Sequence, residues 1–302
     1  MMRSFFLWLS RNPTLRRWVV AHDSFDTVTR RFVAGETEQQ VLDACEALWA
    51  DGYRSTLDHL GENTNTIEDA NAACDIYIHM MEEIVARKLP STVAIKLTQF
   101  GLDISEDACL ENVRRLVTKA GETSSRVEID MEKSQYTDRT VAIAEQASRE
   151  CGCVRVAIQA YLYRSRDDIK RLNEAYTPVR LCKGAYQEPE EVAFPKKADV
   201  DRNYVELMKL LFDEGTYPAI ASHDPAIIEE ALRYVKQRGI GKEEFEFQML
   251  YGIGRPLQRR LMEEGYRVRI YVPYGEEWFP YFMRRLAERP ANVWFVLRSL
   301  FR

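Results

Sequence analysis

The chain has 302 residues, of which 46% are hydrophobic and 29% charged, and its 42 Lys and Arg against 47 Asp and Glu give a formal net charge of −5 at pH 7. This composition is typical of a globular protein with one large domain or two small ones. A mildly acidic chain has no overall attraction for polyanions, which argues against a nucleic-acid partner.

The first 52 residues are predicted to form a helical extension packed on the rest of the chain. One face of a helix would collect Val41, Cys45, Leu48 and Trp49. Nearer the N-terminus, residues 5–9 form the apolar run FFLWL, which is much shorter than the roughly 20 residues of a membrane span. This run fits either a packing segment or a basic and aromatic contact with a membrane surface.

From residue 53 onward, short apolar runs alternate with stretches of helical periodicity. We predict eight strands, each buried on both faces, which begin near Tyr53, Thr92, Arg126, Cys153, Pro178, Tyr217, Phe245 and Tyr266. The stretches between them carry helix signals, such as a capping box from Thr66 to Asp69 and the start Asp224-Pro225. Each interval is long enough for a right-handed crossover helix.

Eight such βα units on about 250 residues are typical of a (βα)8 TIM barrel. An open, doubly wound sheet is the competing arrangement, but it does not require eight strands. We therefore predict an N-terminal helical extension at 1–52 and an α/β barrel at 53–302, with no Ser/Gly-rich linker between them. The six scattered cysteines form no C-x-x-C pair, which favours reduced thiols in the cytoplasm.

In such a barrel, reactive side chains gather where the strands end. The candidates at those positions are Glu62, Lys96, Asp130, Gln159, Arg180, Lys183, Tyr186, His223, Gln248 and Tyr271. Lys96 lies in an apolar run, where a charge is costly unless paired, so an ion pair or a function explains it. Arg180 and Lys183 would point to opposite faces unless the strand ends before Gly184. The four histidines form no metal-binding motif, so we predict no metal site.

The last predicted helix has two contrasting faces. Its apolar stripe contains Phe279, Phe282, Met283 and Leu286. Arg284, Arg285 and Glu288 lie together on the opposite face, which ordinarily would be a solvated surface. The functional alternative is a pair of guanidinium groups that bind a substrate carboxylate bidentately, oriented by Glu288.

Nine short motifs complete the sequence pattern. They are LGE (60–62), IKLT (95–98), EIDME (128–132), IQAYL (158–162), VRLCKGAY (179–186), ASHD (221–224), FEFQMLYGIG (245–254), RIYVPYG (269–275) and RRLAE (284–288). In this order, over about residues 53–290, they resemble the proline dehydrogenases. The chain length is similar to the monofunctional bacterial type, and the motifs to the proline dehydrogenase domain of proline utilisation A proteins.

The resemblance implies a distorted (βα)8 barrel whose last helix lies over the mouth and which holds flavin adenine dinucleotide (FAD) non-covalently. The implied reaction is oxidation of L-proline to Δ1-pyrroline-5-carboxylate, the first step of proline catabolism to glutamate, with hydride passing to flavin N5 and electrons to a membrane quinone. The implied location is the cytoplasm, with peripheral contact at the inner face of the bacterial membrane as a further expectation.

The resemblance also implies roles for individual residues. Lys96, Arg284 and Arg285 would bind the proline carboxylate, Asp130, Tyr271 and Tyr186 would line the ring, Glu62 would pair with Arg284, and Glu288 would orient the arginines. The implied flavin contacts are Gln159, Arg180, Lys183, Gly184, Ala185, Tyr186, Ser222, His223 and Gln248. Of these, Arg180 would lie near N5, Lys183 near the pyrophosphate and Gln159 at an edge of the isoalloxazine.

The chain departs from the family pattern at Gln187, where many relatives carry an aromatic residue that packs beside the cofactor. The polar segment 187–199 that begins there is predicted to be a mobile loop. Two other functions remain open for a barrel of this kind: a Schiff-base aldolase or lyase that uses Lys96 or Lys183, and a barrel that only binds an amino acid. The sequence does not indicate an oligomeric state.

Overall fold

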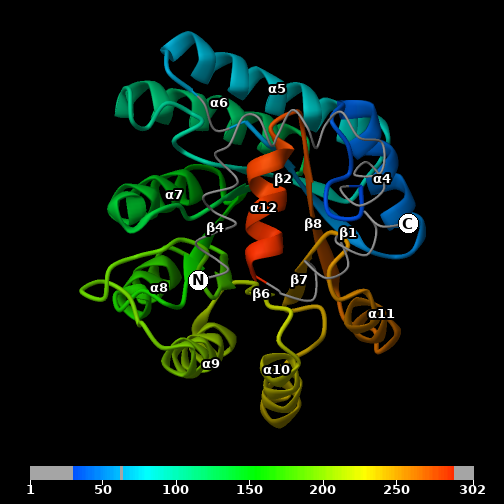
Figure 1. Cartoon of the computed structure of the whole chain (residues 1–302), viewed down its shortest axis with the longest axis vertical. Coiled ribbons are helices and arrows are strands. Elements are labelled where there is room, and N and C mark those ends of the chain that lie inside the picture. Colours follow the sequence, from blue (N-terminus) through cyan, green and yellow to red (C-terminus); the bar gives the residue numbers. More distant parts are fainter. Residues whose placement is uncertain (1–29, 62–63, 289–302) are drawn as a thin grey trace.

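The structure, a computed structural model, describes residues 30–61 and 64–288, and for 284–288 it describes the backbone alone. Eight parallel strands pair in chain order, and β1 pairs with β8 to close a barrel (Figure 1). They are β1 (Arg54–His59), β2 (Ser91–Ile95), β3 (Val127–Ile129), β4 (Val154–Gln159), β5 (Val179–Cys182), β6 (Ala219–Ala221), β7 (Glu246–Leu250) and β8 (Val268–Tyr274). All eight predicted strands and the TIM barrel are confirmed, and the open sheet is excluded.

A ring of helices surrounds the barrel and covers its outer face (Figure 1). The ring consists of α4 (Glu38–Ala50), α5 (Ile67–Ala86), α6 (Glu106–Glu122), the 3-10 helix η1 (Ser134–Tyr136), α7 (Thr137–Cys151), α8 (Ser165–Glu174), α9 (Lys197–Glu214), α10 (Pro225–Arg238) and α11 (Arg255–Glu263). The last helix, α12 (Trp278–Glu288), instead lies over the mouth of the barrel. The predicted start signals are confirmed. Thr66 and Asp69 form a capping box on α5, and the Asp224 side chain accepts the Ala226 N–H at the start of α10.

The main apolar core lies between the strands and these helices, and it includes Leu57, Val93 and Ile129 from successive strands. The half of the barrel interior near the N-terminal ends of the strands is instead charged. Arg155 is fully buried, with Nη1 at 2.5 Å from Glu246 Oε1, and Arg269 Nε lies 2.8 Å from the same oxygen. Because unpaired buried charges are very unfavourable, such groups persist only in networks of this kind.

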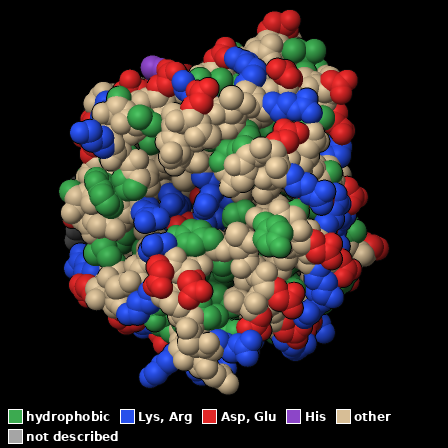
Figure 2. All heavy atoms as spheres, turned by 180° about the vertical axis from the view of Figure 1, so that it is seen from behind, with side chains coloured by type: hydrophobic (Ala, Val, Ile, Leu, Met, Phe, Trp, Pro, Cys, Tyr) green, Lys and Arg blue, Asp and Glu red, His purple; other side chains and the backbone are tan. Residues whose placement is uncertain are grey.

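Figure 2 shows the molecule from the side opposite α12, where Lys and Arg side chains gather near the middle of the face. At this side of the barrel the guanidinium carbons of Arg126, Arg155 and Arg267 lie 5.3–5.7 Å from the centre of the Tyr217 ring. Cations at this distance are attracted to the face of an aromatic ring. The Tyr217 ring therefore lies among the arginines at this end of the barrel.

The N-terminal part that the structure describes is closely attached to the barrel. Helix α4 buries Val41, Leu42 and Cys45 in the main core. Trp49 is 49% exposed, so the predicted stripe was wrong for this residue, because it lies on the side of the helix that turns away from the barrel. The domain boundary at residue 52 stays a prediction, and the apolar run at 5–9 lies outside the described residues.

One cysteine prediction needs correction. The structure joins Cys151 and Cys153 in a disulfide, whereas Cys45, Cys74, Cys109 and Cys182 are free thiols. The two sulfurs can meet because Gly152, at φ +67°, turns the chain sharply at the end of α7.

Of the helices that the structure describes, none has both the length and the apolar character to cross a membrane.

Candidate active site

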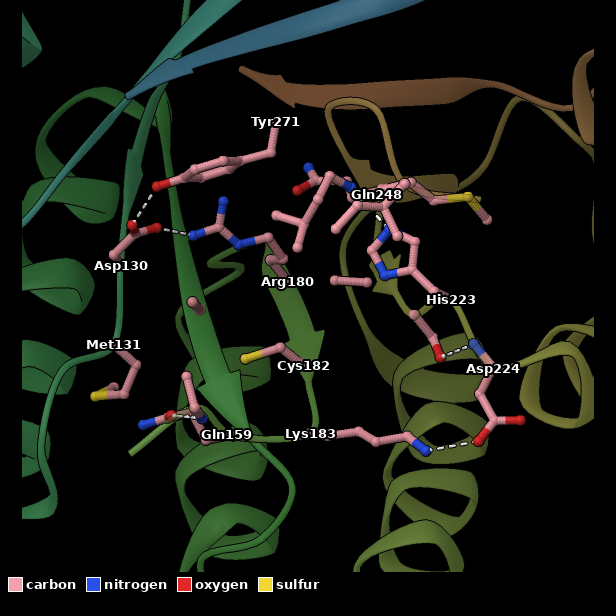
Figure 3. Close-up of a pocket in the computed structure, with 18 of the residues that line it drawn as sticks. Asp130, Met131, Gln159, Arg180, Cys182, Lys183, His223, Asp224, Gln248 and Tyr271 are labelled. Carbon is pink, nitrogen blue, oxygen red and sulfur yellow. Dashed lines mark hydrogen bonds and ion pairs between the residues drawn. The ribbon is translucent and has the colours of Figure 1, made fainter. Parts of the chain in front are cut away.

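A cavity of about 680 Å³ opens at the C-terminal ends of the barrel strands (Figure 3). This volume lies within the range of about 300–1,000 Å³ that is typical of ligand pockets. Its lining includes most of the predicted residues, namely Lys96, Asp130, Gln159, Arg180, Lys183, Gly184, Ala185, Tyr186, Ser222, His223, Gln248 and Tyr271, together with Asp58 and Tyr281. The rule that reactive groups follow barrel strands therefore placed these residues together correctly.

Lys96 follows β2 and is held between two carboxylates. Its Nζ donates to Asp58 Oδ1 at 2.9 Å and lies 3.6 Å from Asp130 Oδ2. Lys96 is 7% exposed and Asp58 2% exposed, so the group is shielded from water. Burial raises the pKa of Asp58 above its usual value, although the Lys96 ammonium opposes this effect. The predicted need for an ion partner is confirmed.

Arg180 connects the cavity to the charged barrel interior. Its guanidinium group donates to Asp130 and, from Nη1 at 3.2 Å, to Glu128, and its Cζ lies 5.4 Å from the ring centre of Tyr271 (Figure 3). The Tyr271 hydroxyl donates to Asp130 Oδ2 at 2.6 Å. Burial alone would raise the pKa of Asp130, but Arg180 and Lys96 outweigh burial and hold it below its usual value. Asp130 is therefore an ionised acceptor at neutral pH.

The loop after β5 approaches β4 closely. The strand ends at Cys182, so Arg180 and Lys183 both line the cavity, as the sequence allowed. The Gln159 Oε1 accepts the Ala185 N–H at 3.1 Å, and its Nε2 donates to the Glu132 carbonyl at 2.9 Å. Gly184 has φ +123°, and a Cβ there would lie only 2.6 Å from Tyr161 Cγ. A residue without a side chain is required at this point.

Lys183 lies between two carboxylates, and Figure 3 shows its contact with one of them, Asp224. Its Nζ is 2.5 Å from Asp201 Oδ1 and 2.7 Å from Asp224 Oδ2. Burial of Asp224 is outweighed by Lys183, which lowers the pKa of this carboxyl group. His223 Nε2 accepts the Leu250 N–H at 2.9 Å, so that nitrogen carries no proton.

Two more predicted contacts are located at the strand ends. The Gln248 Nε2 donates to Glu128 Oε2 at 3.1 Å and to Glu246 Oε1 at 2.8 Å, which fixes its amide over the charged interior. The Ser222 hydroxyl accepts the Asp224 N–H at 3.1 Å at the start of α10.

The described residues contain no group of three or more His, Cys, Asp or Glu side chains that could hold a metal ion.

The remaining predicted residues cannot be placed at the side-chain level. Glu62 lies outside the described residues, and Arg284, Arg285 and Glu288 belong to the part of α12 whose side chains are not described. The backbone of α12 passes over the barrel mouth in Figure 1, and Tyr281 from its second turn lines the cavity. The choice between a solvated face and a carboxylate site for the arginines therefore stays a prediction.

The chain also matches a family of known proteins. Residues 41–298 match the model of the family described as proline dehydrogenase. The chain belongs to the proline dehydrogenase family.

Full-length relatives in this family are enzymes with that name. Proline dehydrogenase 1 of Bacillus subtilis (strain 168) is 40% identical over 300 residues, which cover 99% of both chains. Proline dehydrogenase of Deinococcus radiodurans is 39% identical over 303 residues, covering 99% of this chain and 97% of the relative. At this identity over the full length, enzymatic function as a proline dehydrogenase is supported.

A solved structure agrees with the fold. The crystal structure of proline utilization A from Bdellovibrio bacteriovorus, inactivated by N-propargylglycine, matches with a TM-score of 0.82 and 27% identity over 87% of this chain. This chain spans 33% of that longer protein. The expected similarity to the proline dehydrogenase domain of proline utilisation A proteins is thus confirmed.

Asp58, whose carboxylate lies closest to Lys96, was not predicted from the sequence. It lies within β1, whereas the candidate at this strand was Glu62, which follows it. Side-chain alternation would have revealed it, because Thr56 and Asp58 pair in register with Thr92 and Ala94. The Thr56 and Thr92 hydroxyls lie 2.7 Å apart, which places Asp58 on the same inward face as Lys96.

The predicted loop at 187–199 is partly ordered secondary structure. Helix α9 already begins at Lys197, because the run after it has a continuous helical apolar face. Ahead of it, Ala193 pairs with Leu162, and Glu188 accepts hydrogen bonds from the Ser134 N–H at 2.8 Å and hydroxyl at 2.5 Å. The mobility of the remaining loop stays a prediction.

Proposed function

We propose that this chain oxidises L-proline to Δ1-pyrroline-5-carboxylate with FAD as cofactor and a membrane quinone as the electron acceptor. One observation carries the proposal. A single cavity combines a substrate end, with Lys96, Asp130 and Tyr271, and a cofactor end, with Gln159, Lys183 and the side-chain-free Gly184, in a chain of the proline dehydrogenase family.

The cofactor end fits a flavin. Gly184 lines the cavity, and because it has no side chain the loop after β5 can pack closely against Tyr161, which shapes this wall of the cavity. Gln159 has an amide group in the same wall of the cavity. Lys183 would bind a pyrophosphate if its ammonium group exchanged its contacts with Asp201 and Asp224 for phosphate oxygens. We assign Ala185, Ser222, His223 and Gln248 to the same group. When bound, FAD would accept hydride at N5 and pass the electrons on to quinone.

The substrate end fits a small zwitterionic amino acid. Lys96 would bind the carboxylate together with Arg284 and Arg285, whose helix passes over the mouth. Asp130 and Tyr271 would line the ring on one side, with Tyr186 nearby. Several cations around the carboxylate favour loss of the amine proton, which must leave before hydride can be removed from the ring carbon.

Arg180 is proposed to contact the flavin ring. It carries a permanent charge, and its contacts with Glu128 and Asp130 fix the guanidinium plane before a ligand arrives. A preorganised cation stabilises negative charge that develops beside it without further reorganisation. Glu62 and Glu288 are proposed to pair with and orient the arginines of α12.

A Schiff-base aldolase is less compatible with the geometry. Such an enzyme needs a neutral lysine amine as the nucleophile. Lys96 Nζ is 2.9 Å from Asp58 and 3.6 Å from Asp130, and Lys183 Nζ also contacts two carboxylates. Both lysines are therefore held in ion pairs instead of being free to attack a carbonyl carbon.

The test is an absorbance spectrum of the purified protein, repeated anaerobically after L-proline is added. The proposal predicts flavin bands that bleach with L-proline and return with a soluble quinone. Flavin bands that persist would keep the cofactor and refute proline as the substrate. A protein that remains colourless after incubation with FAD would refute the flavin assignment and favour a barrel that only binds an amino acid.

A further inference from the structure

Residues 30–36, which we call the strap, run past the barrel mouth before α4 begins. Two backbone hydrogen bonds attach the strap to the end of β8 and the residue after it: Ala34 N–H donates to the Pro273 carbonyl at 2.9 Å, and Gly275 N–H donates to the Gly35 carbonyl at 3.0 Å. The strap is therefore fixed to the segment from which α12 starts.

A side-chain hydrogen bond continues this attachment into α12 itself. The indole Nε1–H of Trp278, the first residue of the helix, donates to Glu36 Oε1 at 2.8 Å. Trp278 is 7% exposed, so its N–H has little access to water. Hydrogen bonds to charged groups are stronger than those between neutral groups, and a buried donor that loses its partner is especially unfavourable.

A separate apolar cluster packs the strap against α12 and two neighbouring loops. Its buried members are Phe32, Val33, Leu60, Ile253, Trp278, Phe279, Tyr281, Phe282 and Met283. The ring centres of Phe32 and Phe282 lie 6.0 Å apart, as do those of Trp278 and Phe282. Aromatic pairs at this spacing attract each other beyond the effect of burial. The apolar stripe of α12 thus contacts the strap.

Two further contacts fix the strap, one at Arg31 and one at its junction with α4. At Gly252, which has φ +71°, an added Cβ would lie 2.8 Å from the carbonyl carbon of Arg31 and overlap its oxygen. The backbone of the strap therefore passes directly over the β7–α11 turn. At the other end, Gln40 Oε1 accepts the N–H groups of Glu36 at 2.8 Å and Thr37 at 3.1 Å, which ties the strap to the capping box of α4.

We propose that the strap fixes α12 over the cavity, and that Glu36 and Trp278 are positioning residues that act through this helix. Tyr281 of α12 lines the cavity, and Arg284 and Arg285 follow one turn later. A helix is rigid over such a distance, about 10 Å from Trp278 to Arg285, so fixing its first turn places its last. The consequence for substrate rests on the proposed function, in which these arginines bind the carboxylate.

The test uses the full chain loaded with FAD and four variants: Glu36→Ala, Glu36→Gln, Trp278→Phe and the double variant Glu36→Ala/Trp278→Phe. The first measurement is the rate of limited tryptic cleavage after Arg284 or Arg285, followed by mass spectrometry. We expect Glu36→Ala to raise this rate about tenfold, because α12 detaches more often. Glu36→Gln keeps an acceptor oxygen and should change it less than about threefold.

The second measurement is steady-state oxidation of L-proline. If α12 carries substrate contacts, Glu36→Ala should raise KM about tenfold and change kcat less than about twofold, the pattern of lost binding rather than lost chemistry. The double variant should be no worse than Glu36→Ala, because the indole N–H that would otherwise lose its partner is then absent. Trp49→Phe, at a tryptophan of α4 that is 49% exposed, should leave both measurements unchanged.

The outcomes separate this inference from the proposed function. Unchanged cleavage in Glu36→Ala would refute the strap even in a fully active enzyme. Raised cleavage with an unchanged KM would refute the positioning role and the assignment of Arg284 and Arg285 to the substrate. Raised cleavage in a protein that oxidises no proline would support the strap and refute the proposed function alone.

Discussion

Gly184→Ala should disrupt the cofactor end of the cavity. The new Cβ would lie 2.6 Å from Cγ and 2.7 Å from Cε1 of Tyr161, whereas carbon atoms normally approach to about 3.5–4.0 Å. The side chain is also strained at φ +123°, which costs roughly 1–3 kcal/mol. Overpacking adds about 1–3 kcal/mol, and the stiffer unfolded chain returns about 0.4–1 kcal/mol.

These effects sum to a destabilisation of about 1–5 kcal/mol, unless the loop moves away from Tyr161. Movement would separate the Ala185 N–H from Gln159 Oε1, now 3.1 Å apart, and deform the wall assigned to the flavin. We therefore expect both a lower Tm, by about 2–8 °C, and a lower ratio of bound FAD to protein. Differential scanning calorimetry measures the change in Tm. The ratio of flavin absorbance to protein absorbance measures the amount of bound FAD.

Gly239→Ala is the matched control. Gly239 also has positive φ, +70°, but it follows α10 at a place where an added Cβ meets nothing within 4 Å. It should lose only about 0.5–1 kcal/mol and keep its FAD. Adding Tyr161→Leu to Gly184→Ala should restore part of the lost FAD binding. If Gly184→Ala matched Gly239→Ala in both stability and FAD content, the close approach at Tyr161 would not shape the site.

Three further predictions concern charged groups. Lys96→Met should raise KM for L-proline at least tenfold and raise the kinetic pKa assigned to the proline amine; a pH profile of kcat/KM with an unshifted pKa would count against the cation effect. Tyr271→Phe removes the 2.6 Å hydrogen bond to Asp130, so it should alter the ratio of kcat/KM between proline and hydroxyproline, and equal ratios would discard that role for the hydroxyl. Burial alone would raise the pKa of Glu246, but Arg269 and Arg155 outweigh burial and hold this pKa well below the usual 4.5. The ionised carboxylate therefore stabilises the fold above pH 4.5, and this stabilisation is lost as the pH falls through the lowered pKa. Glu246→Gln should therefore lower the urea midpoint at pH 7 and flatten its decline between about pH 5 and pH 3, and parallel curves for both proteins would contradict the linkage.

Most of the strands were predictable because they are nearly continuous apolar runs, as burial on both faces of a parallel barrel strand requires. The same regularity placed Lys96, Asp130 and Gln159 at one end of the barrel. Burial of a charge is harder to foresee. Arg155, Glu246 and Arg269 stand inside apolar runs just as Lys96 does, but the sequence does not say which charges face one another across a closed barrel.

Other features depended on contacts between distant segments. The exposure of Trp49 follows from how α4 docks, not from its own amphipathic pattern. The Cys151–Cys153 disulfide depends on the turn at Gly152, and a C-x-C pair alone is a weak signal for one. Glu36 carried no signal, because its partner Trp278 lies 242 residues further along the chain.

The pairing of β1 with β8 has a consequence for synthesis of the chain. β1 is finished at residue 59, but its second neighbour begins only at residue 268. At about 5–20 residues per second, a ribosome needs roughly 10–40 s to make the chain between them. During that time β1 has a free edge, with backbone N–H and C=O groups able to pair with another chain. Nascent chains of this protein should therefore need protection from edge-to-edge association until the last strand has emerged.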